Sequence, residues 1–163
     1  GDLLMLRIGS SVEYGMRLMV RLAQESEGGT LSAERLSALE NVPRDYVDQL
    51  LSRLRRAGLI ESRRGAQGGY KLSRRPADIA VGRIVKAVDD GVFEGVCGRY
   101  AEGQQQCSHT DGCGIRPVWE KLGLLVEDYL ERVSLAALLE PETGVSARIS
   151  HLFGEAAGRG AAR

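Results

Sequence analysis

The residues most able to do chemistry are three cysteines in a short stretch of the second half of the chain. Nine residues separate Cys97 from Cys107 and five separate Cys107 from Cys113, with His109 between the last two. Thiolates are the preferred protein ligands of iron-sulfur clusters and also bind zinc, but the spacing is not the two-residue interval of zinc knuckles. From the residues alone, the cysteines are metal ligands, redox-active thiols or inert side chains.

Length and composition limit the kind of protein that can present these cysteines. The 163 residues include 22 basic and 22 acidic side chains, so there is no formal net charge. This length predicts one core domain with an extension. An odd number of cysteines without an apolar signal segment argues against a secreted disulfide scaffold and predicts a cytoplasmic location. No apolar run is long enough to cross a bilayer, so no membrane partner is expected.

The elements that position the cysteines follow from apolar periodicity and turn residues. Helical spacing predicts a helix over 12–23, a short helix after Ser32, and helices over 43–57, 79–88 and 118–139. The segments 59–64 and 69–72 are typical of two short strands joined by a glycine-containing turn. Two helices at a tight turn followed by a hairpin is the order of a winged helix-turn-helix. The predicted fold is therefore mainly α with a small β-hairpin wing and a long C-terminal helix.

This pattern divides the chain into four predicted parts. They are a winged helix-turn-helix DNA-binding domain over 5–90, a cysteine-containing loop over 91–117, a dimerisation helix over 118–140 and a disordered tail over 141–163. The long helix has more apolar face than a small domain can cover, which indicates a homodimer that reads a near-palindromic site. The alternative is that this helix only closes its own domain.

Charge is concentrated where a winged helix contacts DNA. From Arg53 to Arg75, eight basic residues are accompanied by one acid, Glu61. This patch predicts binding to the phosphates of double-stranded DNA, and the alternative is a solvated charged face. We expect base contacts from the start of the third helix, and phosphate or minor-groove contacts from its end and from the hairpin. The predicted DNA-binding residues are Arg44, Asp45, Asp48, Gln49, Arg53, Arg63, Arg64, Gln67 and Tyr70.

Three segments carry a resemblance to a known family. They are the run YVDQLLSRLRRAGLI over 46–60, the wing RRGAQGGY over 63–70 and the run IAVGRIVKAVD over 79–89. With the cysteines that follow, they resemble the Rrf2 family of bacterial winged-helix regulators, in its IscR-like and NsrR-like branches. The resemblance implies a homodimeric repressor or activator with an iron-sulfur cluster, 2Fe-2S or 4Fe-4S, on the three loop cysteines. The cluster would control DNA affinity in response to redox state, nitric oxide or iron-sulfur status.

The resemblance leaves the fourth cluster ligand open. IscR-like members place a histidine three residues after the last cysteine, where this chain has Arg116, which cannot ligate iron. NsrR-like members use an acidic residue near the start of the first helix of the partner subunit, and Glu13 matches that place. Glu13 is the preferred ligand and His109 the second choice, although Glu13 also suits a helix start through the macrodipole alone. The nine-residue first interval is longer than the five to seven usual in the family.

Two other classes of function remain compatible with the sequence. One is a structural-zinc protein with constitutive DNA binding. The other is a cluster-free regulator controlled by thiol redox chemistry or by a protein partner. An enzyme is not indicated, because no phosphate loop, nucleophile elbow or paired acid-base motif is present.

Overall fold

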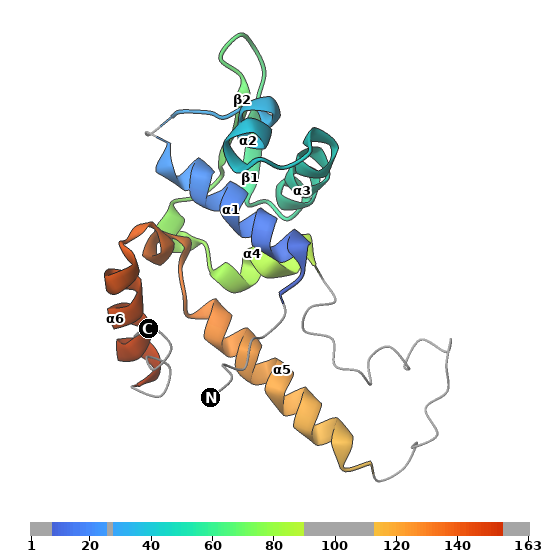
Figure 1. Ribbon diagram of the computed structural model, residues 1–163, viewed down its shortest axis with the longest axis vertical. Coiled ribbons are helices and arrows are strands. Elements are labelled where there is room, and N and C mark those ends of the chain that lie inside the picture. The colour runs from blue at the N-terminus through green and yellow to red at the C-terminus, as the bar shows by residue number, and fades with distance from the viewer. Residues whose placement is uncertain (1–7, 26–27, 90–112, 155–163) are drawn as a thin grey trace.

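The computed structural model describes residues 8–25, 28–89 and 113–154, which form a helical domain with one β-hairpin (Figure 1). The predicted fold class, mainly α with a small hairpin wing, is confirmed. The elements in chain order are α1 (Ser10–Gln24), α2 (Ala33–Glu40), α3 (Arg44–Arg56), β1 (Ile60–Arg63), β2 (Gly69–Leu72), η1 (Pro76–Asp78), α4 (Val81–Val88), α5 (Ile115–Glu131), η3 (Leu135–Leu139) and α6 (Glu142–Phe153).

Helices α2 and α3 form the helix-turn-helix. The Ser32 hydroxyl caps α2 by accepting a 3.1 Å hydrogen bond from the Arg35 amide. The turn contains Asn41 with φ of 52°, a left-handed conformation that asparagine tolerates. Pro43 then precedes α3, whose apolar stripe, including Val47, Leu50 and Leu54, is fully buried. The sequence predicted this helix to within one residue at each end.

The wing is the two-stranded antiparallel hairpin, in the register Ile60–Leu72 to Arg63–Gly69. Tyr70 also pairs with Leu31, so the chain entering α2 lies beside β2. Gly69 has φ of +153°, and a Cβ on it would lie 2.7 Å from the Leu31 carbonyl. Glycine is therefore required where the wing meets the chain before α2.

Helix α4 packs against α1 in the core. A Cβ on Gly15 of α1 would lie 2.8 Å from a methyl carbon of Val88, so the two helices approach closely. The chain returns beside the start of α4, where the Val81 amide donates to the Val133 carbonyl at 2.8 Å. The Leu135 amide donates to the Ile79 carbonyl at the same distance. These bonds fasten the chain that follows α5 to the start of α4.

The C-terminal part differs from the prediction in two places. The predicted helix over 118–139 is interrupted, because α5 ends at Glu131 and the Ser134 hydroxyl caps the separate η3 turn. The predicted disordered tail over 141–163 is wrong for part of its length, because α6 occupies Glu142–Phe153. The Phe153 ring packs on Tyr129 of α5 with a centroid distance of 4.3 Å. Residues 155–163 lie outside the described chain.

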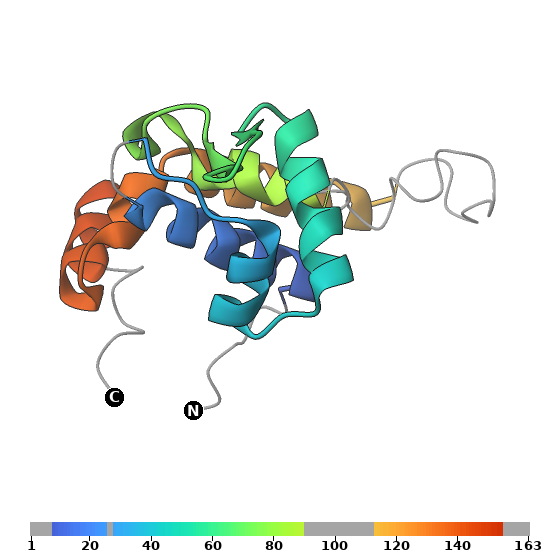
Figure 2. The ribbon, with the colours of Figure 1, turned by 90° about the horizontal axis from the view of Figure 1, so that it is seen from above.

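Helix α5 projects away from the rest of the domain, and its N-terminal end lies farthest out (Figure 1). Helix α6 lies on the opposite side of the domain from α3 (Figure 2). Six large apolar side chains in the first eleven residues of α5 are more than 40% exposed, whereas Tyr129 and Leu130 near its end pack against the core. The exposed ones are Ile115, Val118, Trp119, Leu122, Leu124 and Leu125. Among the described residues, no helix has the length and apolarity needed to cross a membrane.

Candidate nucleic-acid interface

The first turns of α3 present polar side chains to solvent. Arg44, Asp45, Asp48 and Gln49 are all exposed, as a base-reading surface requires. The Arg44 Nε donates to both carboxylate oxygens of Asp48 at 3.1 Å. The pair aligns the guanidinium along the outer face of the recognition helix. Gln49 has an amide that can both donate to and accept from a base edge.

The wing presents a second polar surface, formed by Arg63, Arg64 and Gln67, all exposed. The Thr30 hydroxyl donates to the Gln67 carbonyl at 2.9 Å and fastens the wing tip to the chain before α2. Tyr70 differs from these residues, because it is half-buried and its ring packs against the hydrophobic core. Its main chain forms the pairing with Leu31, so Tyr70 positions the wing in the structure.

The basic patch is smaller than its number of charges suggests. Lys71 forms an ion pair with Glu61 across the strands at 2.8 Å, and Arg75 pairs with Asp78 at 2.8 Å. The Arg53 guanidinium, which we expected to meet phosphate, donates from Nη1 to the Val88 carbonyl at 2.7 Å and joins α3 to α4. This hydrogen bond could not be predicted from the sequence, because it joins residues 35 positions apart.

The cysteine site is described only at its last member. Cys97, Cys107 and His109 lie outside the described residues, whereas Cys113 is half-buried, is not in a disulfide and lies two residues before α5. Within the described ranges, no three His, Cys, Asp or Glu side chains converge as metal ligands would. Glu13 is exposed on the first turn of α1, where its carboxylate is 3.4 Å from Arg17.

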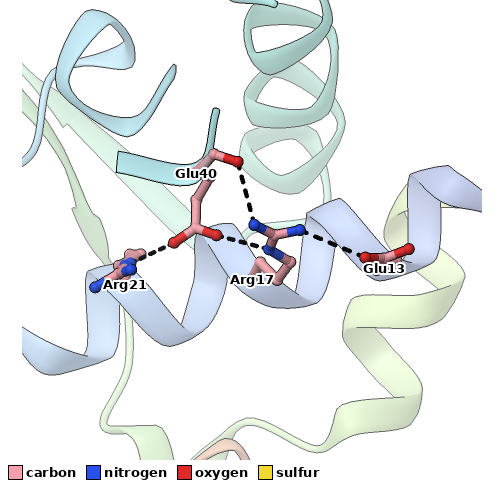
Figure 3. Close-up of polar contacts among 4 residues, drawn as sticks. All are labelled: Glu13, Arg17, Arg21 and Glu40. Carbon is pink, nitrogen blue, oxygen red and sulfur yellow. Dashed lines mark hydrogen bonds and ion pairs between the residues drawn. The ribbon is translucent and has the colours of Figure 1, made fainter. Parts of the chain in front are cut away.

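A buried carboxylate that the sequence analysis missed lies beside this first helix. Glu40, the last residue of α2, is 6% exposed and accepts hydrogen bonds from Arg17 at 2.6 Å and from Arg21 (Figure 3). Burial alone would raise the pKa of Glu40, but the hydrogen bonds from Arg21 and Arg17 outweigh it and lower the pKa. The Glu40 hydrogen bond in turn raises the pKa of Arg17. The only sequence signal was an i, i+4 arginine pair on α1.

We expect Glu40→Gln to lower the free energy of unfolding near neutral pH by about 1–2 kcal/mol, because a charged acceptor of two guanidinium groups becomes neutral. The folded pKa of Glu40 is below its reference value of 4.5. The stabilisation is thus present above that pH and is lost as pH falls through the folded pKa. Denaturant unfolding at about pH 7 and about pH 3 measures this, with the difference between wild type and variant shrinking in acid. Glu34→Gln, on the exposed face of α2, is the control.

Comparisons with known proteins agree with this architecture. The family model described as Rrf2, iron-dependent transcriptional regulator, matches residues 8–141. The HTH-type transcriptional regulator IscR of Pectobacterium atrosepticum is 32% identical over 134 residues, which cover 82% of this chain and 79% of that protein. These relatives are transcription regulators and not enzymes, which agrees with the prediction that the chain is not an enzyme.

Solved structures show the same relationship. IscR of T. potens aligns with a TM-score of 0.65 and 33% identity, over 82% of this chain and 86% of that one. CymR (YrzC), the global cysteine regulator of B. subtilis, aligns with a TM-score of 0.63 and 29% identity, over 83% and 97%. Both solved structures therefore share the fold described above, and the family model covers the same part of the chain. The chain therefore belongs to the Rrf2 family of transcription regulators.

Proposed function

We propose that this protein is a cytoplasmic homodimer whose affinity for a near-palindromic operator is controlled by an iron-sulfur cluster, 2Fe-2S or 4Fe-4S. The observation that carries the proposal is a set of three closely spaced cysteines, the last of them a free thiol at the start of the projecting helix α5. The match to a family described as iron-dependent supports the metal. The signal would be redox state, nitric oxide or iron-sulfur status.

The DNA-contacting surface in this proposal is α3 together with the wing. The exposed Arg44, Asp45 and Gln49 would meet base edges in the major groove. Arg63, Arg64 and Gln67 would enter the neighbouring minor groove or contact phosphate. Arg53 and Tyr70 contribute mainly by position, because the first bonds α4 and the second pairs with Leu31. One such module reads few base pairs, so a stable complex needs two.

The second copy is expected on α5. Its exposed apolar side chains include Trp119 at 43% and Leu122 at 46%, and apolar area of this size is costly to leave in water. Residues 115, 118, 119, 122 and 125 recur at steps of three and four and so share one face of the helix. A self-complementary face on a projecting helix is the geometry of a two-fold dimer seam.

Cys97, Cys107 and Cys113 would hold the cluster, with Glu13 of the partner subunit as preferred fourth ligand and His109 as the other candidate. The donor chemistry fits, because thiolates are the usual cluster ligands and a carboxylate can complete the set. The N-terminal end of α5, which follows Cys113 by two residues, lies away from the start of α1 in the same chain (Figure 1), and this favours a Glu13 supplied by a second copy. When bound, the cluster supplies reversible redox and ligand-exchange chemistry. A change in what the Cys113 thiol binds acts directly on the start of the dimer helix.

Thiol chemistry without a cluster is the second candidate. It is favoured by the similarity to CymR, described as a global cysteine regulator, and by the alignment with an oxidized form of Staphylococcus aureus CymR at a TM-score of 0.65 and 27% identity. In that case Cys113 or its neighbours would change oxidation state and alter operator affinity directly. A structural zinc site would instead give a colourless protein with constitutive DNA binding.

Purification without oxygen, followed by absorption spectroscopy and operator binding, tests the proposal. We expect a brown protein whose visible absorption is lost in Cys97→Ala, Cys107→Ala and Cys113→Ala, with operator affinity in each variant equal to that of the cluster-free wild type. The operator is obtained by selecting duplexes from a random pool with the wild-type protein. A colourless protein that contains zinc, or cysteine variants that keep every cluster-dependent change in affinity, would contradict it.

A further inference from the structure

The first turn of α3 carries an arginine that is held by a carboxylate. Arg44 is the first residue of α3, and Asp48 lies one turn later on the same face of the helix. The Arg44 Nε donates to Oδ1 and to Oδ2 of Asp48, each at 3.1 Å. Both side chains stay about half exposed, at 52% for Arg44 and 46% for Asp48. The pair therefore lies on the solvent side of the recognition helix, where DNA would approach.

Helix stability does not explain this pair. A cation in the first turn of a helix lies at the positive end of the macrodipole, where it is unfavourable. The order of the pair is also the less favourable one, because an acid stabilises a helix more when it precedes the base than when it follows it. The face of α3 that packs on the core is formed by other residues, among them Val47 and Leu51. Positions where local preferences are violated are expected to be functional sites.

The bonds to Asp48 leave the outer edge of the Arg44 guanidinium available. Within the described part of the chain, Nη1 and Nη2 of Arg44 have no hydrogen-bond partner. These two groups donate in one plane and match two acceptors that lie side by side. In the major groove guanine presents such a pair, N7 and O6, whereas adenine presents one acceptor and one donor. A guanidinium already fixed by Asp48 also loses less side-chain freedom when it binds.

The charge of Asp48 has opposite consequences with and without its partner. A lone carboxylate facing DNA opposes binding, because the duplex carries one negative charge per about 1.7 Å of its axis. In the pair, the Arg44 guanidinium neutralises this carboxylate, and the carboxylate orients the guanidinium. The effect of removing Asp48 should therefore depend on whether Arg44 is present.

We propose that Arg44 reads a guanine at one position of each operator half-site, and that Asp48 is a positioning residue that holds the guanidinium for this contact. The inference rests on the part of the proposed function that inserts α3 into the major groove. It adds the base that is read and the residue that sets the preference. Cluster state does not enter it, so it can be tested on the protein in either state.

Selection of duplexes from a random pool, followed by titration with 7-deazaguanine duplexes, tests the reading of guanine. We expect the wild type to enrich guanine at one position of each half-site and Arg44→Ala to show no preference there. 7-Deazaguanine lacks the N7 acceptor. Placed at that position in one half-site, it should weaken wild-type binding about tenfold and leave Arg44→Ala binding unchanged. Arg44→Lys, which keeps the charge but not the forked geometry, should show a smaller preference than the wild type.

A double-mutant cycle tests the role of Asp48. Asp48→Ala should lower the preference for guanine about fivefold and tighten binding to a nonspecific duplex, because an acid is removed. Asp48→Asn, which keeps a carbonyl acceptor for the Arg44 Nε, should retain part of the preference. In the Arg44→Ala background, Asp48→Ala should tighten binding to every duplex and leave the base preference unchanged. Circular dichroism checks that each variant is folded.

The matched control is Arg132→Ala, which removes the arginine of another exposed arginine–aspartate pair, with Asp128 at 3.0 Å, and should leave base preference unchanged. Guanine preferences that all survive in Arg44→Ala, or an equal effect of Asp48→Ala in both backgrounds, would overturn the inference. If Arg44→Ala binds too weakly for selection, Arg44→Lys replaces it, and a sensitivity to 7-deazaguanine equal to that of the wild type would be the contradicting result. A wild type that enriches no sequence would overturn operator recognition itself, so the two failures are distinguishable.

Discussion

Replacement of Leu122 by aspartate is expected to convert the protein to monomers and to lower operator affinity by a factor of about 10²–10⁴. The reason is that the two winged helices are then no longer linked, so the second half-site loses the high effective concentration that a dimer gives. Leu122 lies among the exposed apolar residues that share one face of α5. A carboxylate there would have to be desolvated in the dimer without a partner. Sedimentation equilibrium gives the oligomeric state, and titration of the selected operator gives the affinity.

The matched control is Leu124→Asp. Leu124 is on the same helix and is 61% exposed, but it lies two residues on and hence on nearly the opposite side of α5. That side also carries the charged residues Lys121, Asp128 and Glu131. The control should remain dimeric and bind the operator as the wild type does. A dimeric Leu122→Asp protein would contradict the proposed seam.

The second large effect is expected in the wing. Arg63→Ala combined with Arg64→Ala should lower operator affinity by about two to three orders of magnitude at moderate salt, because each substitution removes a cation from both subunits. The plot of log affinity against log salt should become less steep by about 0.9 for each phosphate that the variant no longer neutralises. Fluorescence anisotropy over a salt series measures both quantities.

The control for this pair removes the same amount of charge elsewhere. Arg132 and Arg148 are exposed residues in the C-terminal part of the chain, paired with Asp128 and Glu140 respectively. Their combined replacement by alanine should leave the salt dependence unchanged. An unchanged slope in the wing variant would show that the wing does not approach phosphate.

The DNA-binding domain was predictable because its signals are local. The Ser32 cap, Pro43 before α3, the buried stripe from Val47 to Leu54 and Gly65 in the turn of the wing each act within a few residues. Local conformational preference and tertiary packing agree there. The third helix and both strands were therefore predicted to within one residue at each of their ends.

The C-terminal region was harder because tertiary pairing overrides its periodicity. Apolar residues continue at helical spacing past Glu131, but α5 ends there. The main chain of Val133 and Leu135 instead forms hydrogen bonds with Val81 and Ile79 at the start of α4. Composition also concealed α6, whose last residue packs on Tyr129 from a distant part of the sequence. Neither contact has a local signature.

The site shows the same division. The exposed polar residues of α3 and the wing followed from helix and hairpin positions, whereas Arg53 and Glu40 take their partners from other elements. A charge run could not show that Arg53 bonds Val88. The presence of an acidic residue near the predicted turn between two helices could not show that Glu40, at the end of α2, is buried between two arginines.

The most direct test of cluster control is the operator affinity of one anaerobic preparation measured before and after its cluster is removed, at fixed salt and protein concentration. The proposal predicts a dimer in both states and a change in affinity that disappears in Cys113→Ala. Equal affinity of the two wild-type states, with visible absorption present in one and absent in the other, would contradict control by the cluster.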